Sequence, residues 1–340
     1  MAAAERTQFS PTFGVEFEFA LATLEPGKED PHPNDPRQVY GLTPRKRIPT
    51  ADLDDDDNYD WSSLLTVEQH IVETLTRAGI PVLGESAVSG DTSEVSTSWV
   101  VSTDYSVEGP KDPLNYVWYP MEIQSPAFHF TEAAIQNVKF VCSILAETYR
   151  INVNESCGLH VHVGNMTNGY SLKQLKCFMA TVWTFEPQLD FLHPAHRLNN
   201  KYCEGLRKHA AINHFKSPAQ VLVEIKNAAD ANCILAMMRV TPLSKSAYEI
   251  SNLCQPPIEE IKRTIEFRQH EGCIDPRAVE QWIRTCVGIV EFAAEVDEDA
   301  WFEQLLEYIE MDREDFSVVK ALMVLGLPLQ ARYYGLKLFK

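Results

Sequence analysis

The sequence predicts an α+β fold in which an antiparallel β-sheet carries helices on its apolar face. Two observations favour this class. Segments with the period-2 alternation of strands come in neighbouring groups, without the strict strand–helix–strand rhythm of parallel sheets. In addition, no Gly-rich phosphate loop follows any of these segments.

The predicted elements follow from local periodicity and from breaks in it. The first half reads as strand 12–21, helix 66–78, strands 99–104 and 118–125, helix 131–149, strand 157–164 and helix 172–192. The second half reads as a polar loop 197–216, one or two helices over 218–239, a strand 263–270 and helices over 276–338. The Pro-rich segment 22–63, with its acidic run 54–57, is expected to be an irregular, solvated loop and not a calcium site.

Composition excludes several classes of protein. A net charge of −18 argues against a nucleic-acid binder, because the basic run 45–47 is short and no cluster of Lys and Arg outweighs the acidity. The amino terminus lacks the apolar core of a signal peptide, and no apolar run is long enough to cross a bilayer. We therefore expect a cytoplasmic protein that does not bind membranes. The eight scattered cysteines predict neither disulfides nor a zinc site.

Four of the predicted strands share one peculiarity. Side chains alternate between the two faces of a strand, so residues two apart lie on the same face. In each of these strands one face is apolar and the other carries reactive groups. The reactive rows are Glu16 and Glu18, Glu122 and Gln124, His160 and His162, and Glu266, Arg268 and His270.

If these strands pair in one sheet, its polar face collects carboxylates, imidazoles and an arginine. Carboxylate oxygens with an occasional imidazole suit Mg²⁺ or Mn²⁺, whereas zinc favours more His and Cys ligands. A guanidinium among acids suits phosphate, because its fork binds two phosphate oxygens at once. Each row alone also fits a half-exposed strand that turns its polar residues to solvent. Four such rows together favour a metal and phosphate site.

The motifs on these strands resemble the carboxylate-amine ligase superfamily of glutamine synthetase and glutamate-cysteine ligase, and most closely its amidoligase branch. The matching motifs are GVEFEF at 14–19, DYS at 104–106, MEIQSP at 121–126, CGLHVHV at 157–163, RxxNxYC at 197–203 and TIEFR at 264–268. They cover about residues 13–275. The resemblance implies a glutamine synthetase-like catalytic architecture, and we expect one catalytic domain over 1–340 whose helical region 276–340 resembles the family less.

The resemblance also implies roles for individual residues. The metal ligands would be Glu16, Glu18, Glu122, His160 and Glu266. His162 and Arg268 would face the phosphates of ATP, and Asp104 would orient the amine or accept its proton. Arg197, Asn200 and Tyr202 lie where the branch is expected to grip its substrate.

The activity implied is ATP- and Mg²⁺- (or Mn²⁺-) dependent formation of an amide or isopeptide bond through an acyl phosphate, from a small-molecule or peptide carboxylate and an amine. Three alternatives stay open: a phosphagen-type kinase, a metal-dependent hydrolase that uses the HxH motif, and a nucleotide-binding regulator with a degenerate site.

A thiol ligase using Cys157 is disfavoured, because alternation places Cys157 on the face of Leu159. Neither the two substrates, nor the oligomeric state, nor a role for segments 22–63 and 84–98 follows from the sequence.

Overall fold

The computed structural model describes residues 9–41, 61–87, 97–111, 116–214, 216–241, 243–253, 263–311 and 315–338. The basic run 45–47, the acidic run 54–57 and most of segment 84–98 lie outside these residues. Within the described part, no helix combines the length and the apolar character needed to cross a bilayer.

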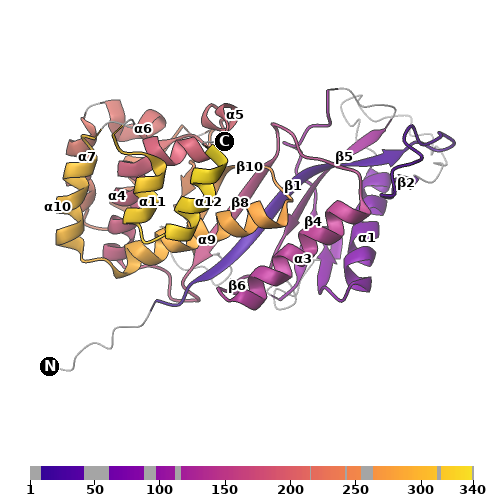
Figure 1. Ribbon diagram of the computed structural model, residues 1–340, viewed down its shortest axis with the longest axis horizontal. Coiled ribbons are helices and arrows are strands. Elements are labelled where there is room, and N and C mark those ends of the chain that lie inside the picture. The colour runs from indigo at the N-terminus through magenta and orange to yellow at the C-terminus, as the bar shows by residue number, and fades with distance from the viewer. Residues whose placement is uncertain are drawn as a thin grey trace, which may run out of the picture.

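A large, mostly antiparallel sheet forms the centre of the molecule (Figure 1). Its strand order is β3-β4-β5-β1-β8-β10-β9, and the short strands β2, β6 and β7 also pair with β1. Only the β1–β2 and β3–β4 pairs described here are parallel. The strands are β1 (Thr12–Leu24), β2 (Tyr40–Gly41), β3 (Val82–Gly84), β4 (Trp99–Ser102), β5 (Val117–Gln124), β6 (Phe128–His129), β7 (Ile151–Asn152), β8 (Gly158–Gly164), β9 (Tyr248–Glu249) and β10 (Thr264–Glu271).

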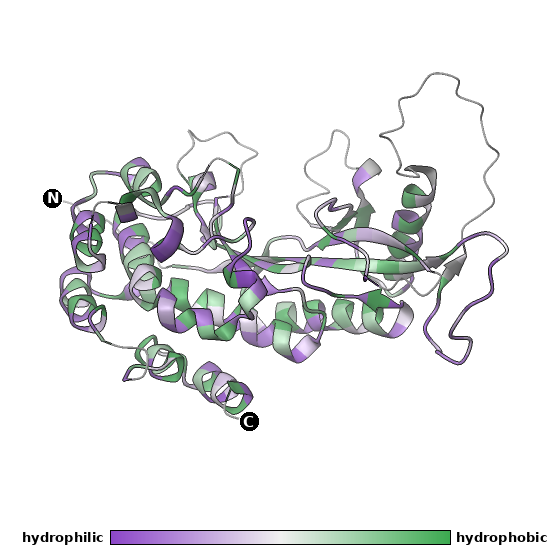
Figure 2. Cartoon of the chain, turned by 90° about the horizontal axis from the view of Figure 1, so that it is seen from above, coloured by the Kyte–Doolittle hydropathy of each residue, from purple (hydrophilic) through white to green (hydrophobic). Residues whose placement is uncertain are grey.

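Two long helices, α3 and α9, lie along one face of the sheet, and the view in Figure 2 shows a row of helices on one side of the strands. Helix α1 packs on β3, β4 and β5, while α4 packs on α9 and on α7, α10 and α11. The helices are α1 (Trp61–Arg77), α3 (Glu132–Thr148), α4 (Leu172–Leu189), α5 (Ala195–Leu198), α6 (Leu206–His209), α7 (Pro218–Asn227), α8 (Ala231–Met238), α9 (Pro276–Glu295), α10 (Glu298–Tyr308), α11 (Val318–Val324) and α12 (Pro328–Leu338). Short 3₁₀ turns are η1 (Glu85–Ala87), η2 (Asp190–Leu192), η3 (Ala211–His214) and η4 (Ser251–Leu253).

Local sequence explains where the two long helices begin. The Thr131 hydroxyl accepts the backbone N–H of Ala134 and caps α3. The Asp275 carboxylate caps α9 in the same way, and Pro276 occupies the first turn, where its missing N–H costs nothing. Both helices therefore start where the chain leaves a strand or loop, and both turn an apolar stripe toward the sheet.

The sheet's apolar face forms the core. Phe17, Leu159, Val161 and Phe267 from the three central strands are almost fully buried, and Trp99 stacks on Phe17 with ring centroids 6.2 Å apart. This confirms the predicted mixed fold with a mostly antiparallel sheet. The prediction ended the first strand at residue 21, whereas β1 continues to Leu24, because Ala22 and Thr23 are buried and still pair with β5. The predicted polar loop 197–216 contains the short helices α5 and α6 and the turn η3.

Part of segment 22–63 is tied firmly to the sheet. Residues 25–39 leave the end of β1 and pass over Arg150, whose guanidinium is buried. Asp30 binds this guanidinium at 2.5 Å and also accepts the hydroxyl of Tyr116 at 2.9 Å. Asp35 adds a carboxylate oxygen 3.4 Å from the Arg150 Nε atom. A buried arginine needs such partners, so the start of the segment is an ordered strap.

Candidate active site

Strand register brings the predicted reactive rows together on one face of the sheet. Because β1 is the central strand, Glu18 lies directly opposite Glu122 on β5, and Glu16 lies opposite His160 on β8. On the next strand pair, Glu266 of β10 lies opposite His162. Residues directly opposite in an antiparallel pair share a face, so the four strands present one continuous polar row.

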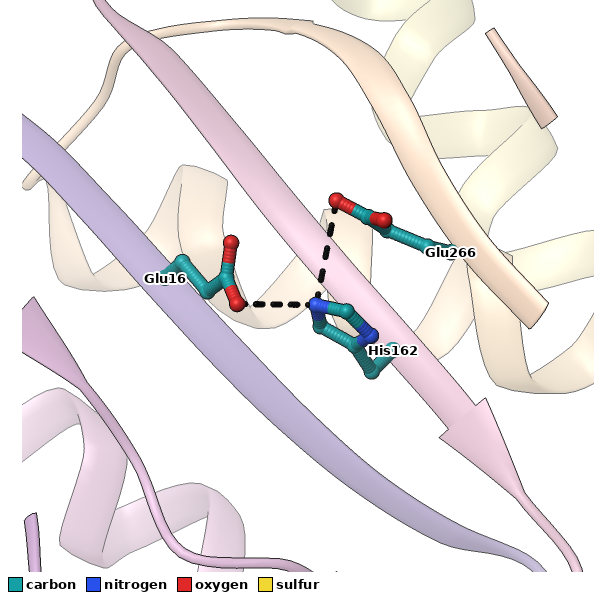
Figure 3. Close-up of side chains that lie close together, drawn as sticks. All are labelled: Glu16, His162 and Glu266. Atoms are coloured by element: carbon teal, nitrogen blue, oxygen red, sulfur yellow. Dashed lines mark hydrogen bonds and ion pairs between the residues drawn. The ribbon is translucent and has the colours of Figure 1, made fainter. Parts of the chain in front are cut away.

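The first group in this row consists of Glu16, His162 and Glu266 (Figure 3). The Nε2 atom of His162 lies 2.9 Å from Glu16 Oε1 and 3.8 Å from Glu266 Oε1. One possible ligand atom of each residue lies within 4.8 Å of the others. Three strands, β1, β8 and β10, supply one residue each.

The second group consists of Glu18, Asp104 and Glu122, whose carboxylate oxygens also converge within 4.8 Å. Glu18 and Glu122 come from paired strands, while Asp104 comes from the loop that follows β4. Asp104 is held by a turn in which its Oδ1 atom accepts the backbone N–H of Ser106 at 2.7 Å. All three members are acids, so this group is the more negative of the two.

His160 lies between the two groups. Its Nδ1 atom is 3.1 Å from Glu16 and 3.7 Å from Glu266, and its Nε2 atom is 3.4 Å from Glu18. The ring is 3% exposed, so it contacts carboxylates on both sides and almost no solvent. The five predicted metal ligands and Asp104 therefore form one contiguous cluster.

Burial and neighbouring charges act differently on two of the acids. Burial favours the protonated form of Glu16, but the adjacent His162 and His160 outweigh it and hold the pKa of Glu16 well below its ordinary value. Burial and the charge of Glu16 together raise the pKa of Glu122 to about 7. The two carboxylates thus differ in proton affinity although they lie on adjacent strands.

Arg268 brings the cationic group that the row was predicted to contain. Its Nη1 atom donates to Glu266, and its Nε atom donates to the carbonyl of Tyr202 at 3.0 Å. Asn200 shapes the same turn, because its side-chain oxygen accepts the N–H of Tyr202 at 2.8 Å. Arg268 and the 200–202 turn therefore border the first group, with the Tyr202 side chain 38% exposed.

The Arg197 side chain, for which the motif implied a contact with substrate, is buried. It is 2% exposed and donates to three backbone carbonyls, those of Arg268 at 2.7 Å, of Gln269 at 3.4 Å and of Cys157 at 3.4 Å. A guanidinium committed to the backbone of β10 and to the start of β8 holds these strands in place. We therefore assign Arg197 a positioning role, while its contact with substrate stays a prediction.

Sequence reasoning missed several supporting groups. The backbone N–H of Gly158 donates to Glu18 at 2.6 Å, and Thr264 Oγ1 lies 3.1 Å from the Nδ1 atom of His162. Gly158 also leaves space, because a Cβ atom there would lie 2.7 Å from His160 Nε2. The contact of a backbone N–H cannot be predicted from residue types. The glycine that begins the HxH strand was the one feature of the sequence that could have indicated this position.

A further carboxylate on β9 was also missed. Glu249 lies directly opposite Glu266 and so shares its face. No strand is predicted between residues 239 and 263, because a run as short as the two-residue β9 gives no clear periodicity. The order Tyr248-Glu249-Ile250, an acid between two buried apolar residues, is the only local signal.

The interpretation of His270 as a member of the polar row was wrong. A β-bulge between Phe267 and His270 shifts the register, so that His270 pairs with Leu159 on the apolar face. There its ring packs against Trp282, with centroids 5.1 Å apart. One extra residue in a strand reverses the face of everything that follows, which alternation alone cannot reveal.

Cys157 also differs from its predicted placement. The chain turns at 154–157 before β8 begins, and the Cys157 side chain packs with Ala20 and Val107. Ala20 follows Glu18 by two residues on β1, so this small apolar cluster adjoins the polar face. Burial raises the pKa of the Cys157 thiol, which leaves it a poor nucleophile at neutral pH.

The donor set of the cluster fits hard divalent cations. Each group of three offers mainly carboxylate oxygens, the ligands that Mg²⁺ and Mn²⁺ prefer, and the first group adds one imidazole nitrogen. In the two groups and beside them, five carboxylates surround two imidazoles and the Arg268 guanidinium, an excess of negative charge that cations would offset. These carboxylates are Glu16, Glu18, Asp104, Glu122 and Glu266.

Comparison with known proteins agrees with this geometry. No curated protein matches the chain. A family model described as "putative amidoligase enzyme" matches residues 10–290, which include every strand of the sheet and all residues of both groups. The matched span agrees with the span of about 13–275 expected from the motifs. The chain therefore belongs to this amidoligase family, whose name points to a ligase that forms amide bonds.

Proposed function

We propose that the chain is an ATP-dependent carboxylate-amine ligase that forms an amide or isopeptide bond through an acyl phosphate. The observation that supports this most is the pair of ligand groups on one sheet face with Arg268 beside them. Phosphoryl transfer asks a protein mainly to position reactants and to place positive charge along the phosphate oxygens. A site with two acidic groups and one guanidinium is suited to that task.

We assign the residues as follows. Glu16, His160 and Glu266 would hold one divalent cation, and Glu18 and Glu122 a second. Bound there, Mg²⁺ or Mn²⁺ would neutralise phosphate oxygens of ATP and of the transferring group. Arg268 would release Glu266 in part and bind phosphate, and His162 would donate a hydrogen bond from its ring N–H.

In the first step, an oxygen of the substrate carboxylate attacks the γ-phosphorus of ATP, and ADP leaves with the electrons of the broken P–O bond. The acyl phosphate has a good leaving group and no carboxylate charge. In the second step, the amine nitrogen attacks the acyl carbon and inorganic phosphate leaves. The nitrogen then loses a proton to a nearby carboxylate. Asp104 is suited to accept it, because the loop after β4 brings its carboxylate to the second group.

The test is ADP release by the purified protein with Mg²⁺ and a panel of amino acids, peptides and polyamines. We expect ADP release that requires both a carboxylate and an amine, with a condensed product detected by mass spectrometry. Hydroxylamine in place of the amine should trap the acyl phosphate as a hydroxamate. Release of ADP with a guanidine alone would indicate a kinase instead, and hydrolysis without ATP would indicate a hydrolase.

A further inference from the structure

A polar cavity is lined by residues that belong to neither ligand group of the candidate active site. It encloses about 210 Å³ and is bordered by the end of α4, by the chain around α5 and α6, and by β10. The residues that matter here are Glu186, Asp190, Gly205, Arg207, Lys208 and Gln269. Gln269 follows Arg268 in the bulged part of β10, but its side chain reaches Asp190 while that of Arg268 reaches Glu266.

Two acids one helical turn apart line this cavity. Glu186 is 2% exposed, and one of its oxygens accepts the backbone N–H of Leu206 at 2.6 Å. Burial and the neighbouring Asp190 raise the pKa of Glu186 to about 8, a sign that the two carboxylates are close in a poorly solvated place. Carboxylates held close together in such a place are stabilised when a cation binds beside them.

Gln269 supplies the second, independent observation. Its side chain is 2% exposed, and its Nε2 atom donates to Asp190 Oδ1 at 2.8 Å, which fixes the orientation of the amide. The Oε1 atom is buried and has no hydrogen-bond partner among the described residues. A buried acceptor without a donor is uncommon in folded proteins, so this oxygen points to a ligand that donates a hydrogen bond.

Two cationic residues, Arg207 and Lys208, also border the cavity, and the backbone N–H of Arg207 donates to the second oxygen of Glu186. The Arg207 guanidinium lies over the ring of Trp183, 5.3 Å from its centroid, and the exposed Lys208 places its Nζ atom 3.3 Å from Asn199 Oδ1. The cavity therefore has an acidic wall with an open acceptor and a basic rim. Its volume corresponds to roughly seven waters at about 30 Å³ each. Ligand pockets for drug-sized molecules are larger, about 300–1,000 Å³.

We propose that this cavity binds a small zwitterion of the free amino acid class. The primary ammonium group would lie against Asp190 and Glu186 and donate to Gln269 Oε1, and the carboxylate would face Arg207 and Lys208. Such a ligand meets both signs of charge in the cavity and is small enough to enter it. The proposal is independent of the proposed catalytic function, because it concerns binding at a separate site. Since Gln269 adjoins Arg268, an occupant would also stabilise the bulge that places Arg268 in the candidate active site.

The experiment uses the full chain without nucleotide or metal. Glycine, alanine, serine and 4-aminobutyrate are titrated calorimetrically, with methylammonium and acetate as the two half-ligands. We expect at least one of the four zwitterions to bind with one-to-one stoichiometry, at least tenfold more tightly than either half-ligand. Asp190→Asn and Gln269→Leu should each weaken that binding at least tenfold. Glu307→Gln, which removes one exposed acid from α10, is the matched control and should leave affinity unchanged.

Two results would overturn the proposal. One is the absence of binding by all four zwitterions to the unmodified chain. The other is unchanged affinity in both cavity variants with normal circular dichroism, which would move the bound amino acid to another site. If either variant fails to fold, Gly205→Ala replaces it, because the new methyl group lies 3.4 Å from Glu186 Oε1 and narrows the cavity without a backbone clash. Loss of ADP release in the turnover assay would leave these outcomes unaffected.

Discussion

Two pairs of histidines lie in and beside the same sheet in opposite environments. His160 and His162 lie on the polar face among the carboxylates of Glu16 and Glu266. His270, on the apolar face of β10, packs with His193 and Trp282, where the ring centroids of the two histidines are 5.8 Å apart. Burial lowers the pKa of His270 to about 4 and that of His193 well below its usual range. Charged side chains lie on the polar face, whereas the two histidines on the apolar face are held in their neutral form.

The neighbours of each histidine therefore decide its role. An imidazole beside carboxylates is ready to bind cations or phosphate, whereas one beside Trp282 serves as a neutral core residue. Strand β8 and the first half of β10 both alternate apolar and reactive residues. The bulge in β10 separates the two outcomes, because it sends Arg268 to one face and His270 to the other.

The largest effect is expected from neutralising the polar face. Glu18→Gln and Glu266→Gln should each reduce ATP-dependent amide formation by about 10³-fold or more, because a ligand is lost from the charge-stabilising site. The free energy of unfolding should change by less than about 1 kcal/mol or rise, since each variant removes one of several crowded like charges. Turnover and urea unfolding measure the two quantities. If either variant unfolds, the acid that it replaces is needed for stability and the prediction is contradicted.

The apolar face should respond to pH. Because His270 is neutral when folded and has a pKa of about 4, while the unfolded chain takes up a proton near pH 6.5, stability should be lost as the pH falls from about 6.5 to about 4. Each such histidine contributes at most about 1.4 kcal/mol per pH unit. His270→Phe should flatten the dependence in urea unfolding between pH 7 and 4. An identical slope in the variant would show that His270 does not stay neutral.

A smaller effect separates a glycine of the site from an ordinary one. Gly158→Ala should displace the His160 ring and lower stability by about 1–3 kcal/mol, because the new Cβ atom lies 2.7 Å from Nε2. Gly335→Ala, inside α12, meets Val319 only at 3.4 Å and should stabilise by about 0.5–1 kcal/mol. Thermal unfolding of both variants checks the signs. Equal shifts would mean that Gly158 leaves no special space for His160.

Much of this arrangement follows from the sequence, and the exceptions have physical causes. Alternation correctly placed Glu16, Glu18 and Glu122 on one face, because a strand without a bulge keeps its period of two. It failed for His270, where the ladder is irregular, and for Cys157, which precedes its strand. The buried contacts of Arg197 with backbone carbonyls were beyond prediction, since they depend on how distant segments pack.

The cavity at the end of α4 was even less predictable from the sequence. Glu186 and Asp190 have the spacing of one helical turn, which the sequence displays, but their partner Gln269 is 79 residues further along than Asp190. Only the fold brings them together. The motifs identified the family through residues that share a sheet, whereas the cavity joins a helix end, a loop and the reverse side of a strand.

The central claim, that two acidic groups on the polar face form divalent-cation sites, is tested most directly by Mn²⁺ titration. Electron paramagnetic resonance reports the free Mn²⁺, and hence the amount bound by the unmodified chain and by Glu18→Gln and Glu266→Gln. We expect about two bound ions for the unmodified chain, one held by Glu16, His160 and Glu266 and one by Glu18 and Glu122, and loss of one ion in each variant. Binding of no Mn²⁺, or identical binding by all three proteins, would contradict the account.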